Sequence, residues 1–497
     1  MENYKKGAAL SVAATVAGKV FSFLSSLLLA FYFGATVKTD IYFYLILICA
    51  VITGWLSSIN VSLVLPEFMH QREKSLNSAF NLANCFLYIY AAAALIFCTT
   101  AYFFPAQILG FISAFSPAET AQAGNLMFLS CVYFFSYFIM SYLISLSESF
   151  RLFGIYFLTP LNTLMPLLAL LAFKNLEAMF LGYISAYWIQ ILFCLYILRR
   201  KTGWIFKPGR PELNRKFLLN FAYSQPSAFA WAAVLYAPIF MISSTQAGMV
   251  SAVNYSRMLS DSPTDILTSK VNNVAKVKFT CEAAKNQFEQ MAQTIIKTDK
   301  FNMLLLVPFC VFTCIFAEDI IIMFFKRGGF TLQDAHNTAK FLAMFIMAVP
   351  FIGLNNNISN TFAALRIIKE ITPRYLVLAL VFTAFFIAGV KYYGAYAYPV
   401  LFLAMYAVMT LMNIITLRRF APFIPYGRHI LWVIKMIVVS FLCSSAAKAI
   451  FAFYEGNVFI KIFINGSFFV AVNAAVLYWA GELSGFKKLM GAKWKFR

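Results

Sequence analysis

The chain has 497 residues, of which 62% are hydrophobic and 12% are charged. This composition is far more apolar than that of soluble globular domains, so it excludes a soluble protein and indicates a chain that crosses a membrane many times. The formal net charge of +21 has the sign that nucleic acid attracts, but the basic residues gather in alternate loops between apolar segments, which is a pattern of membrane topology.

Fourteen apolar segments follow one another along the chain, each close to the ~20 residues that a helix needs to cross a bilayer. We therefore predict an all-α polytopic membrane protein with 14 transmembrane helices. Their approximate ranges are 8–32, 40–65, 79–104, 121–147, 155–173, 178–198, 217–242, 246–275, 301–324, 337–365, 375–390, 397–417, 429–452 and 456–480. The first range is too long for the apolar core of a signal peptide, so we expect it to remain as a span.

The distribution of Lys and Arg predicts the orientation of these helices. With the N-terminus in the cytoplasm, 28 of the 40 basic residues fall in inner segments and five fall in outer segments. Because cytoplasmic loops carry the excess of Lys and Arg, we predict that both termini are cytoplasmic. The inner charges then act as topology signals and contact anionic lipid, and nucleic acid is not an expected partner.

The first predicted helix has a polar face. Five of its residues share one side at helical spacing: Ser11, Thr15, Lys19, Ser22 and Ser26. Lys19 lies midway along the span, where its ammonium group cannot easily reach either membrane surface, so it is a candidate for ligand binding. Asp40, at the start of the second helix, suits a cap of that helix as well as a contact to a transported ligand.

The basic segment 199–216 is the clearest internal boundary. Six predicted spans precede it and six follow before a final pair, so both six-span halves start in the cytoplasm. That arrangement predicts two six-helix lobes with parallel pseudo-symmetry about an axis along the membrane normal. The predicted domains are an N-terminal lobe at 1–198, a basic cytoplasmic linker at 199–216, a C-terminal lobe at 217–417, and two C-terminal helices with a basic tail at 418–497.

The eighth predicted helix is the most polar span. At about 100° per residue, one stripe of its surface holds Asn254, Arg257, Asp261, Thr264, Asp265, Thr268 and Asn272. Intramembrane charges face a bundle interior or a water-filled cavity, so the stripe predicts the wall of a polar transport cavity. The alternative is a structural ion pair between Arg257 and Asp261 that holds helices together. Pro263 lies opposite the stripe and is expected to kink the helix.

Two later segments depart from the apolar pattern. The polar stretch 280–300 has helical periodicity and is predicted to lie along the inner membrane surface as a linker. The cluster 355–360, in the tenth span, has four asparagines and follows Pro350. Such clusters are typical of membrane helices that unwind where they line a cavity, so we expect this helix to be interrupted there.

The sequence contains no recognisable set of metal ligands or catalytic groups. The nine cysteines lie mostly in apolar segments without paired spacing, and the three histidines are scattered. A phosphate-binding loop of the GxxxxGK type is missing, so ATP hydrolysis is not expected. The longest outer connection, 105–120, is short for the catalytic loop of a glycan polymerase. We therefore expect no metal, no cofactor and no enzymatic activity.

Four stretches carry a family resemblance. They are GKVFSFLSSLLLAFYFGATVKTDIYF at 18–43, GMVSAVNYSRMLSDSPTDIL at 248–267, MFFKRGGFTLQDAHNTAKFL at 323–342 and ALRIIKEITP at 364–373. In order and spacing they resemble the MviN/MurJ family of lipid II flippases, across nearly the whole chain. That family lies within the multidrug/oligosaccharidyl-lipid/polysaccharide exporter superfamily, with the MATE multidrug exporters and the Wzx-type flippases. The resemblance implies two six-helix lobes, a central cationic cavity and two extra helices that form a lipid-accessible groove.

The resemblance also implies a function. The expected activity is a flippase that moves an undecaprenyl-pyrophosphate-linked glycan, lipid II or a related lipid-linked oligosaccharide, from the inner to the outer leaflet by alternating access. The expected location is the bacterial cytoplasmic (inner) membrane, and a monomer is the favoured state. Two alternatives stay open: a Wzx-like flippase for exopolysaccharide or O-antigen repeat units, and a MATE-like cation or drug antiporter.

The predicted substrate-binding residues are Lys19, Ser26, Asp40, Asn254, Arg257, Asp261, Thr264 and Asp265. Lys19 and Arg257 look placed like cavity arginines of the family, and Asp261 resembles an acidic position there. We expect Lys19 and Arg257 to bind the pyrophosphate and Asp261 to orient Arg257. The chain departs from the family pattern at Ser25 and Ser26, where an Arg–Asp pair is usual, so its cavity is expected to hold fewer charges.

The resemblance suggests a sodium site among the seventh, eleventh and twelfth helices. Their ranges, 217–242, 375–390 and 397–417, contain no Asp or Glu. A hard cation prefers oxygen ligands, of which at least one is negatively charged. We therefore predict that the sodium site is absent and that the membrane potential drives the transport cycle.

Overall fold

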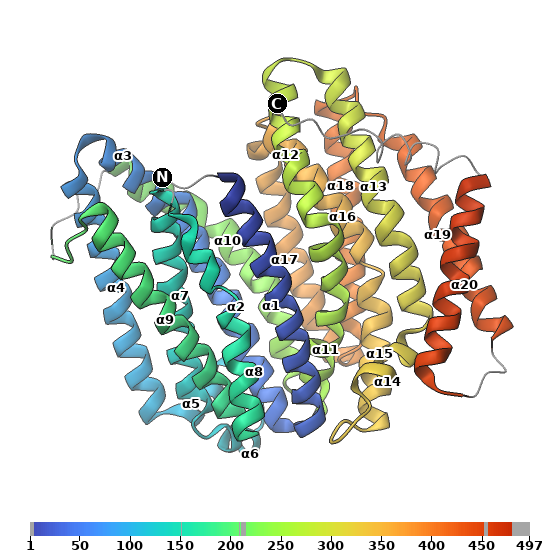
Figure 1. Cartoon of the computed structure of the whole chain (residues 1–497), viewed down its shortest axis with the longest axis horizontal. Coiled ribbons are helices and arrows are strands. Elements are labelled where there is room, and N and C mark those ends of the chain that lie inside the picture. The colour runs from blue at the N-terminus through green and yellow to red at the C-terminus, as the bar shows by residue number, and fades with distance from the viewer. Residues whose placement is uncertain (1–3, 151, 208, 210–214, 452–455, 480–497) are drawn as a thin grey trace. The chain divides into compact units, whose positions relative to one another are not determined.

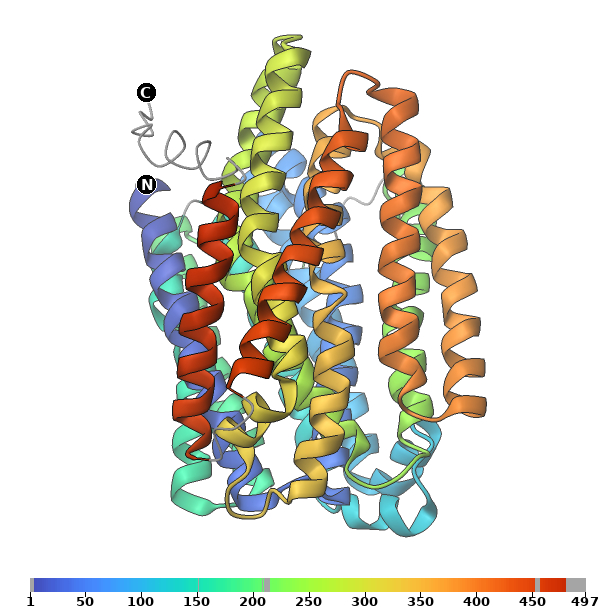
Figure 2. The same ribbon diagram turned by 90° about the vertical axis from the view of Figure 1, so that its right-hand side faces the viewer.

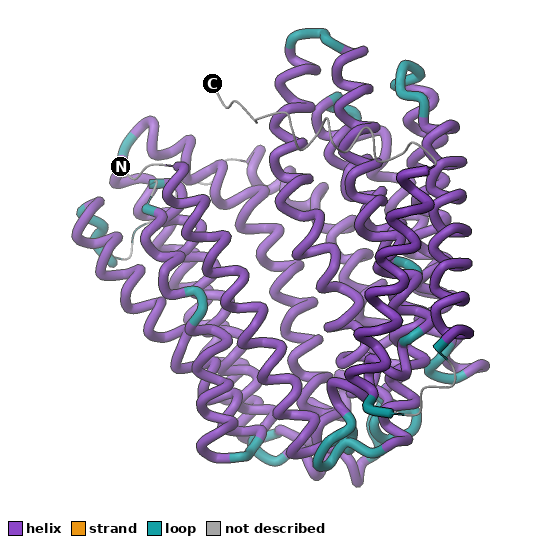
Figure 3. Tube along the Cα trace, turned by 45° about the vertical axis from the view of Figure 1, so that its right-hand side comes forward, coloured by secondary structure: helices purple, strands orange, loops and turns teal. Residues whose placement is uncertain are grey.

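The computed structural model describes residues 4–150, 152–207, 209, 215–451 and 456–479. All regular structure in these residues is helical (Figure 3). Thirteen helical segments in this described part are long and apolar enough to cross a membrane. The predicted all-α polytopic membrane fold is therefore confirmed.

The chain forms two compact units. The first comprises Met1–Ser251, Arg327–Thr331 and Ala379–Ala395, and the second comprises Ala252–Lys326, Leu332–Leu378 and Tyr396–Arg497. In the sequence, the first unit's long segment ends at Ser251, whereas the predicted lobes are separated at the basic segment 199–216. The lobes and their pseudo-symmetry stay a prediction.

The first unit is a bundle of long apolar helices with short connections (Figure 1). Its helices are α1 (Tyr4–Phe33), α2 (Val37–Ile59), η1 (Asn60–Val64), α3 (Leu65–Lys74), α4 (Leu76–Phe103), α5 (Pro105–Ile112), α6 (Pro117–Thr120), η2 (Ala121–Ala123), α7 (Leu126–Ser149), η3 (Phe153–Leu158), α8 (Leu161–Phe173), α9 (Leu176–Thr202) and α10 (Arg215–Ile242). Helix α7 packs against α2, α4 and α9, while α8 packs against α1 and α9. These helices are apolar on most of their surface, as expected for segments that contact both neighbouring helices and lipid.

The first part of the predicted basic linker is bound to the first unit. Gly203, with a φ of +72°, ends α9 in the left-handed conformation that glycine adopts easily. The indole nitrogen of Trp204 then donates to Asn84 Oδ1 on α4 at 2.8 Å, and Asn84 Nδ2 donates to the carbonyls of Ile205 and Lys207. One buried side chain thus holds residues 204–207 against α4.

The second unit contains the remaining helices, except that the first three residues of α11 and the later half of α17 are assigned to the first unit. They are α11 (Met249–Pro263), η4 (Thr264–Thr268), α12 (Ser269–Ala284), α13 (Phe288–Ile315), α14 (Ala317–Phe325), α15 (Leu332–Ile346), α16 (Val349–Ala364), α17 (Ile368–Tyr393), α18 (Ala397–Phe420), α19 (Tyr426–Ile450) and α20 (Val458–Trp479). Helix α13 packs against α12, α15, α16 and α19. Helices α19 and α20, coloured from orange-red to red, lie side by side (Figures 1 and 2).

The eighth predicted span is interrupted where its proline predicts a kink. Helix α11 ends at Pro263, a π-helical turn spans Thr264–Thr268, and α12 continues from Ser269. Proline removes a main-chain donor and crowds the preceding turn, so the regular hydrogen-bond ladder cannot run through it. This polar span is not among the thirteen apolar segments of the described residues, although it lies between two of them in the chain.

The prediction of a surface linker at 280–300 is wrong. The stretch is divided between the end of α12 and the start of α13, which meet at a tight turn where Asn286 has a φ of +57°. Phe279 and Met291 are fully buried in a hydrophobic cluster with Ile295. The apolar positions that produce the helical periodicity therefore face other helices of this unit.

The predicted interruption at 355–360 is also wrong, because α16 runs through it without a break. Asn355 and Asn357 are buried, and both find partners on other helices. Asn355 Nδ2 donates to Thr410 Oγ1 at 2.8 Å, and Asn413 Nδ2 donates to Asn355 Oδ1 at 2.8 Å. Since the amides bind side chains of neighbouring helices, the main chain keeps its own hydrogen bonds.

Candidate functional site

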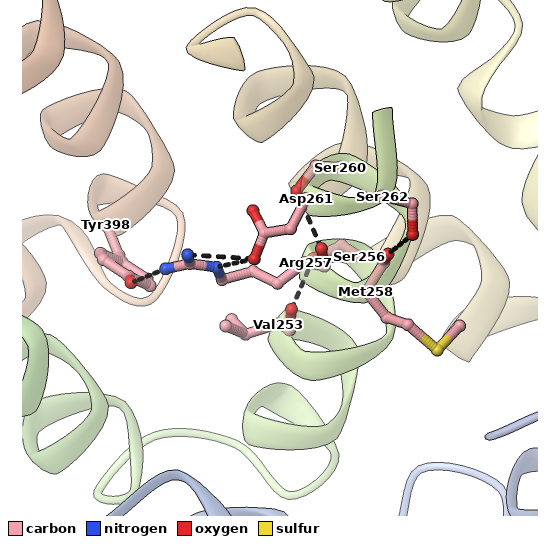
Figure 4. A network of polar contacts seen from close by, with 8 residues as sticks. All are labelled: Val253, Ser256, Arg257, Met258, Ser260, Asp261, Ser262 and Tyr398. Atoms are coloured by element: carbon pink, nitrogen blue, oxygen red, sulfur yellow. Dashed lines mark hydrogen bonds and ion pairs between the residues drawn. The ribbon is translucent and has the colours of Figure 1, made fainter. Parts of the chain in front are cut away.

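Arg257 and Asp261 form the ion pair that their spacing predicts. Both lie on α11, four residues apart, so their side chains project from the same side of the helix. Asp261 Oδ2 is 3.2 Å from Arg257 Nη2 and 3.4 Å from Nε (Figure 4). The carboxylate thus accepts from one edge of the guanidinium and fixes the direction in which its plane points.

Aromatic residues of α15 and α18 hold the same guanidinium. Tyr398 accepts a hydrogen bond from Arg257 Nη1 at 3.0 Å, on the side away from Asp261 (Figure 4). The guanidinium carbon is 4.8 Å from the centre of the Phe402 ring and 5.7 Å from that of Phe345. Such cation–π contacts are worth about 0.5–2 kcal/mol. Together, these contacts restrict Arg257 to one rotamer, with little freedom left to lose on binding a ligand.

Both side chains of the Arg257–Asp261 pair are partly exposed, and the guanidinium has N–H groups that these contacts do not use. The side chain of Arg257 is 25% exposed and that of Asp261 is 44% exposed. A guanidinium has five N–H donors, and the hydrogen bonds to Asp261 and Tyr398 among the described residues engage three of them. Arg257 can therefore donate to an oxyanion without breaking its existing contacts.

The predicted polar stripe is divided by the π-helical turn. Asn254 and Thr264 are half-buried, like Arg257. Thr268 and Asn272, placed on the same stripe by regular α-helical spacing, are buried inside the second unit. A π turn adds one residue to the ladder, so the positions beyond it rotate by about 100° relative to a straight α-helix. The side chain of Asp265, which lies within this turn, is outside the described residues.

Lys19 and Ser26 belong to the first unit, on α1. Lys19 is exposed, and Ser26 is half-buried, with its hydroxyl donating to the Ser22 carbonyl at 3.1 Å. The seven-residue separation places both side chains on one face, two turns apart. In the described part of α1, Lys19 is thus an exposed cationic side chain in the middle of the span.

Asp40 caps a helix, but not the helix that its sequence position suggests. Thr36 and Thr39 form the capping box of α2. Asp40 is buried, and its carboxylate accepts from the main-chain nitrogens of Gly248 and Ser251 at 2.5 Å and 2.7 Å and from Ser251 Oγ at 2.6 Å. These donors lie at the N-terminal end of α11, in its first turn and in the residue before it, where the partial positive charge of the helix favours a carboxylate. The expectation that Asp40 caps the second helix is therefore wrong.

The family model described as "Lipid II flippase MurJ" matches residues 29–469 of the chain. The chain belongs to this MurJ family. The sequence resemblance to this family is thereby confirmed. The probable lipid II flippase MurJ of Borreliella burgdorferi is 22% identical over 409 residues, which make up 79% of this chain and 79% of the relative.

Solved structures show the same MurJ-type fold. A structure of lipid II flippase MurJ in an inward closed conformation has a TM-score of 0.77 with 17% identity, over 95% of this chain and 99% of the solved one. An inward-facing MATE family transporter has a TM-score of 0.64 with 10% identity, over 81% of this chain and 94% of the transporter. At these identities the structures establish the fold alone.

The sequence alone did not point to the aromatic residues of this MurJ-family site. Tyr398 and Phe402 contact Arg257, and Tyr406 follows them at the same four-residue spacing on α18. The spacing indicates aromatic side chains on one face of the helix. Aromatic residues make up 18% of the chain, however, so this spacing alone does not distinguish a binding site from ordinary packing. The described residues contain no group of three His, Cys, Asp or Glu side chains arranged to hold a metal ion.

Proposed function

We propose that this chain is a flippase that moves an undecaprenyl-pyrophosphate-linked glycan, lipid II or a related lipid-linked oligosaccharide, from the inner to the outer leaflet. The observation that carries the proposal is the restrained, partly exposed guanidinium of Arg257 in a chain of the MurJ family. A diphosphate headgroup cannot cross hydrocarbon without polar partners, because burying unpaired charge is costly. The protein would supply these partners in place of water.

The chemistry of Arg257 suits a diphosphate. A guanidinium binds phosphate oxygens with parallel N–H donors, and these charge-assisted hydrogen bonds are roughly twice as strong as neutral ones. Asp261, Tyr398 and Phe402 hold the group in place before the substrate arrives, so binding costs little side-chain entropy. Lys19, on α1, is the second proposed phosphate contact, as a point charge.

The remaining predicted site residues have supporting roles in this proposal. Asn254 and Thr264 offer neutral hydrogen bonds to the headgroup or its glycan, Ser26 lies on the same face of α1 as Lys19, and the role of Asp265 stays a prediction from the sequence. Asp40 acts by fixing the start of α11 through its contacts with Gly248 and Ser251. A MATE-like antiporter for cations is less well supported, because the carboxylates of Asp40 and Asp261 are already engaged by internal partners.

The proposal includes the setting of the protein. We infer a multi-pass protein of the bacterial cytoplasmic (inner) membrane, with both termini cytoplasmic, that works as a monomeric transporter without enzymatic activity and without nucleic-acid partners. The 28-to-5 distribution of basic residues supports this orientation.

The proposed two-lobe architecture has support from an unusual helical feature. The second span of the first half contains a π turn at Asn60–Val64, before the proline-containing start of α3. The second span of the second half contains one at Thr264–Thr268, directly after Pro263. Because π turns are rare, the occurrence of one in the second span of each half supports parallel repeats at 1–198 and 217–417, joined by the linker 199–216 and followed by 418–497.

A translocation assay tests the function directly. Purified protein in liposomes that carry a potential should move fluorescent lipid II, or an undecaprenyl-pyrophosphate-linked repeat unit, into the outer leaflet. Arg257→Ala should remove this activity, while Arg419→Ala, a matched loss of an exposed arginine at the end of α18, should retain it. Transport of drug cations in exchange for protons, without lipid movement, would instead identify an antiporter.

A further inference from the structure

A second polar site connects three helices of the second unit through Asp299. This residue lies on α13 and has no exposed surface. Its Oδ1 accepts a hydrogen bond from Asn357 Nδ2 on α16 at 2.7 Å, and its Oδ2 accepts one from the Tyr426 hydroxyl on α19 at 2.9 Å. Both α16 and α19 pack against α13 (Figures 1 and 2). The carboxyl group thus bonds to one side chain from each neighbour.

The surroundings of Asp299 exclude water on several sides. Ile295, one turn earlier on α13, and Ile358, beside Asn357, are fully buried in the same hydrophobic cluster as Tyr426. One turn later, Asn302 is also fully buried and donates to Asn272 Oδ1 at 2.6 Å. The carboxyl group therefore lies among buried apolar side chains, and its hydrogen-bond partners are neutral.

Asp299 has no ion-pair partner among the side chains that the structure describes. An ionised carboxylate in a low-dielectric interior requires a cation or several strong hydrogen bonds, and two neutral donors replace only part of its hydration. A protonated carboxyl group has no net charge and is far less costly to bury. The geometry therefore favours the neutral acid while the site is closed.

The partners of Asp299 can accommodate both protonation states. The Tyr426 hydroxyl can donate to a carboxylate, and it can also accept a hydrogen bond from a carboxylic acid. The Asn357 amide can donate to the other oxygen in either case. Because both partners direct N–H or O–H groups at Asp299, the site suits a proton better than a sodium ion, which requires converging oxygen atoms.

We propose that Asp299 is a proton-binding site of the transport cycle, which holds a proton while α13, α16 and α19 are packed as observed and releases it when this region opens to water. The inference rests on the proposed function, because the cycle is that of the flippase. Proton binding favours the closed packing, so a rise in pH should favour the hydrated state. The linkage is one proton, which allows at most a tenfold change in the equilibrium per pH unit.

Other titratable groups lie on the elements that surround Asp299. Helix α19 contributes Tyr426 and His429, α13 contributes Lys300, and α12 contributes Glu282. Lys300 contacts the Trp432 ring at 5.2 Å, and Glu282 has a Lys278 ion pair at 3.6 Å together with a hydrogen bond from Thr294. The side chains of Lys270 and Arg428, on α12 and α19, are outside the described residues. Helix α16 presents Asn357, which does not titrate.

Infrared spectroscopy of the purified protein tests the proton directly, because a protonated carboxyl group has a C=O band that a carboxylate lacks. The wild type should show this band at neutral pH, and Asp299→Asn should lose its contribution while keeping both neighbouring hydrogen bonds. Glu282→Gln is the matched control, since it removes a buried carboxylate that has a cation partner, and it should leave the band unchanged. If Asp299→Asn and the wild type have the same carboxyl bands, the proposal is wrong. Loss of the band when sodium is added would also overturn it, in favour of a cation site.

Translocation provides the second measurement, at fixed potential and with equal pH on both sides of the membrane. The wild-type rate should change with pH, by up to tenfold per unit, whereas Asp299→Asn should show no such dependence. An unchanged pH profile in Asp299→Asn would contradict the coupling. If no lipid moves in any variant but the infrared band is present and lost in Asp299→Asn, the proposed function fails and the proton site is retained.

Discussion

The carboxylate of Asp40 binds the first turn of a helix that starts more than two hundred residues later in the chain. One of its oxygens lies 2.7 Å from the main-chain nitrogen of Ser251 and 2.6 Å from the Ser251 hydroxyl. The other accepts from Gly248, whose φ of +88° and close approach to Ala35 leave no room for a side chain. Asp40 thus determines where α11 begins, and Arg257 follows on that helix.

Replacement of Asp40 should destabilise the protein more than it affects ligand chemistry. Asp40→Ala leaves buried main-chain donors without acceptors, at about 1–3 kcal/mol for each group, in addition to the lost cap. Ser251→Ala removes only the hydroxyl and should cost about 1 kcal/mol. Thermal unfolding of both variants in detergent should show the larger loss for Asp40→Ala. Equal melting temperatures for Asp40→Ala and the wild type would mean that this contact contributes little.

Variants of the cationic residues should separate binding from folding. Lys19→Ala and Arg257→Ala should each abolish lipid translocation while the protein stays folded and inserted, because each removes a charge that the diphosphate requires. Lys435→Ala is a matched control for Lys19, since it removes another exposed lysine from a spanning helix. Translocation in liposomes and elution volume in detergent are the two measurements. If both variants retain full activity, or fail to accumulate, the ion pair is structural.

The contacts of Arg257 predict graded effects for its neighbours. Tyr398→Phe removes one hydrogen bond and keeps the ring, so the translocation rate should fall by about tenfold, equivalent to about 1.4 kcal/mol. Asp261→Asn keeps the shape but removes the countercharge, and its effect should be similar if the residue only orients the guanidinium. A collapse of expression in Asp261→Asn, with normal expression in Tyr398→Phe, would show instead that Asp261 neutralises a buried charge.

The features that the sequence predicted correctly are those that depend on residues close together in the sequence. The spans follow from apolar length, and the Arg257–Asp261 pair follows from a separation of four on one helix. The contacts of Asp40 and Asn355 could not be predicted in this way, because their partners lie on helices that are distant in the chain. The π turn after Pro263 changed which side chains share a face, since a periodicity of 3.6 assumes an unbroken ladder.

The orientation of the chain can be tested by cysteine labelling in a variant without its nine native cysteines. Single cysteines at Phe111 and Lys326 should react with an impermeant maleimide from outside the cell. Cysteines at Lys207 and Ala284 should react only after the membrane is permeabilised. All four positions are exposed in the structure. A position that does not react from outside the cell therefore lies on the cytoplasmic side of the membrane and is not simply buried in the protein. The opposite pattern would overturn the predicted cytoplasmic location of both termini.

No sodium site is predicted among the seventh, eleventh and twelfth spans, and polar side chains of these spans form hydrogen bonds with other helices. On α18, Asn413 accepts from the Tyr375 hydroxyl at 3.0 Å and donates to Asn355, and Thr410 accepts from Asn355. On α10, the Gln225 carbonyl accepts from the indole of Trp55 at 3.0 Å. These neutral groups have protein partners, and the predicted spans 217–242, 375–390 and 397–417 supply no carboxylate to balance a cation.

We expect the membrane potential to drive the cycle, because a unit charge that crosses 100 mV gains about 2.3 kcal/mol. An inside-negative potential draws the empty cationic site toward the cytoplasm, and the negative headgroup offsets that charge on the outward stroke. We therefore expect translocation to collapse when valinomycin and potassium dissipate the potential at constant pH. It should persist when choline replaces sodium, and Lys19→Gln, which lowers the moving charge, should weaken the dependence on potential. A strict requirement for sodium at constant potential would show that an ion gradient drives the cycle instead.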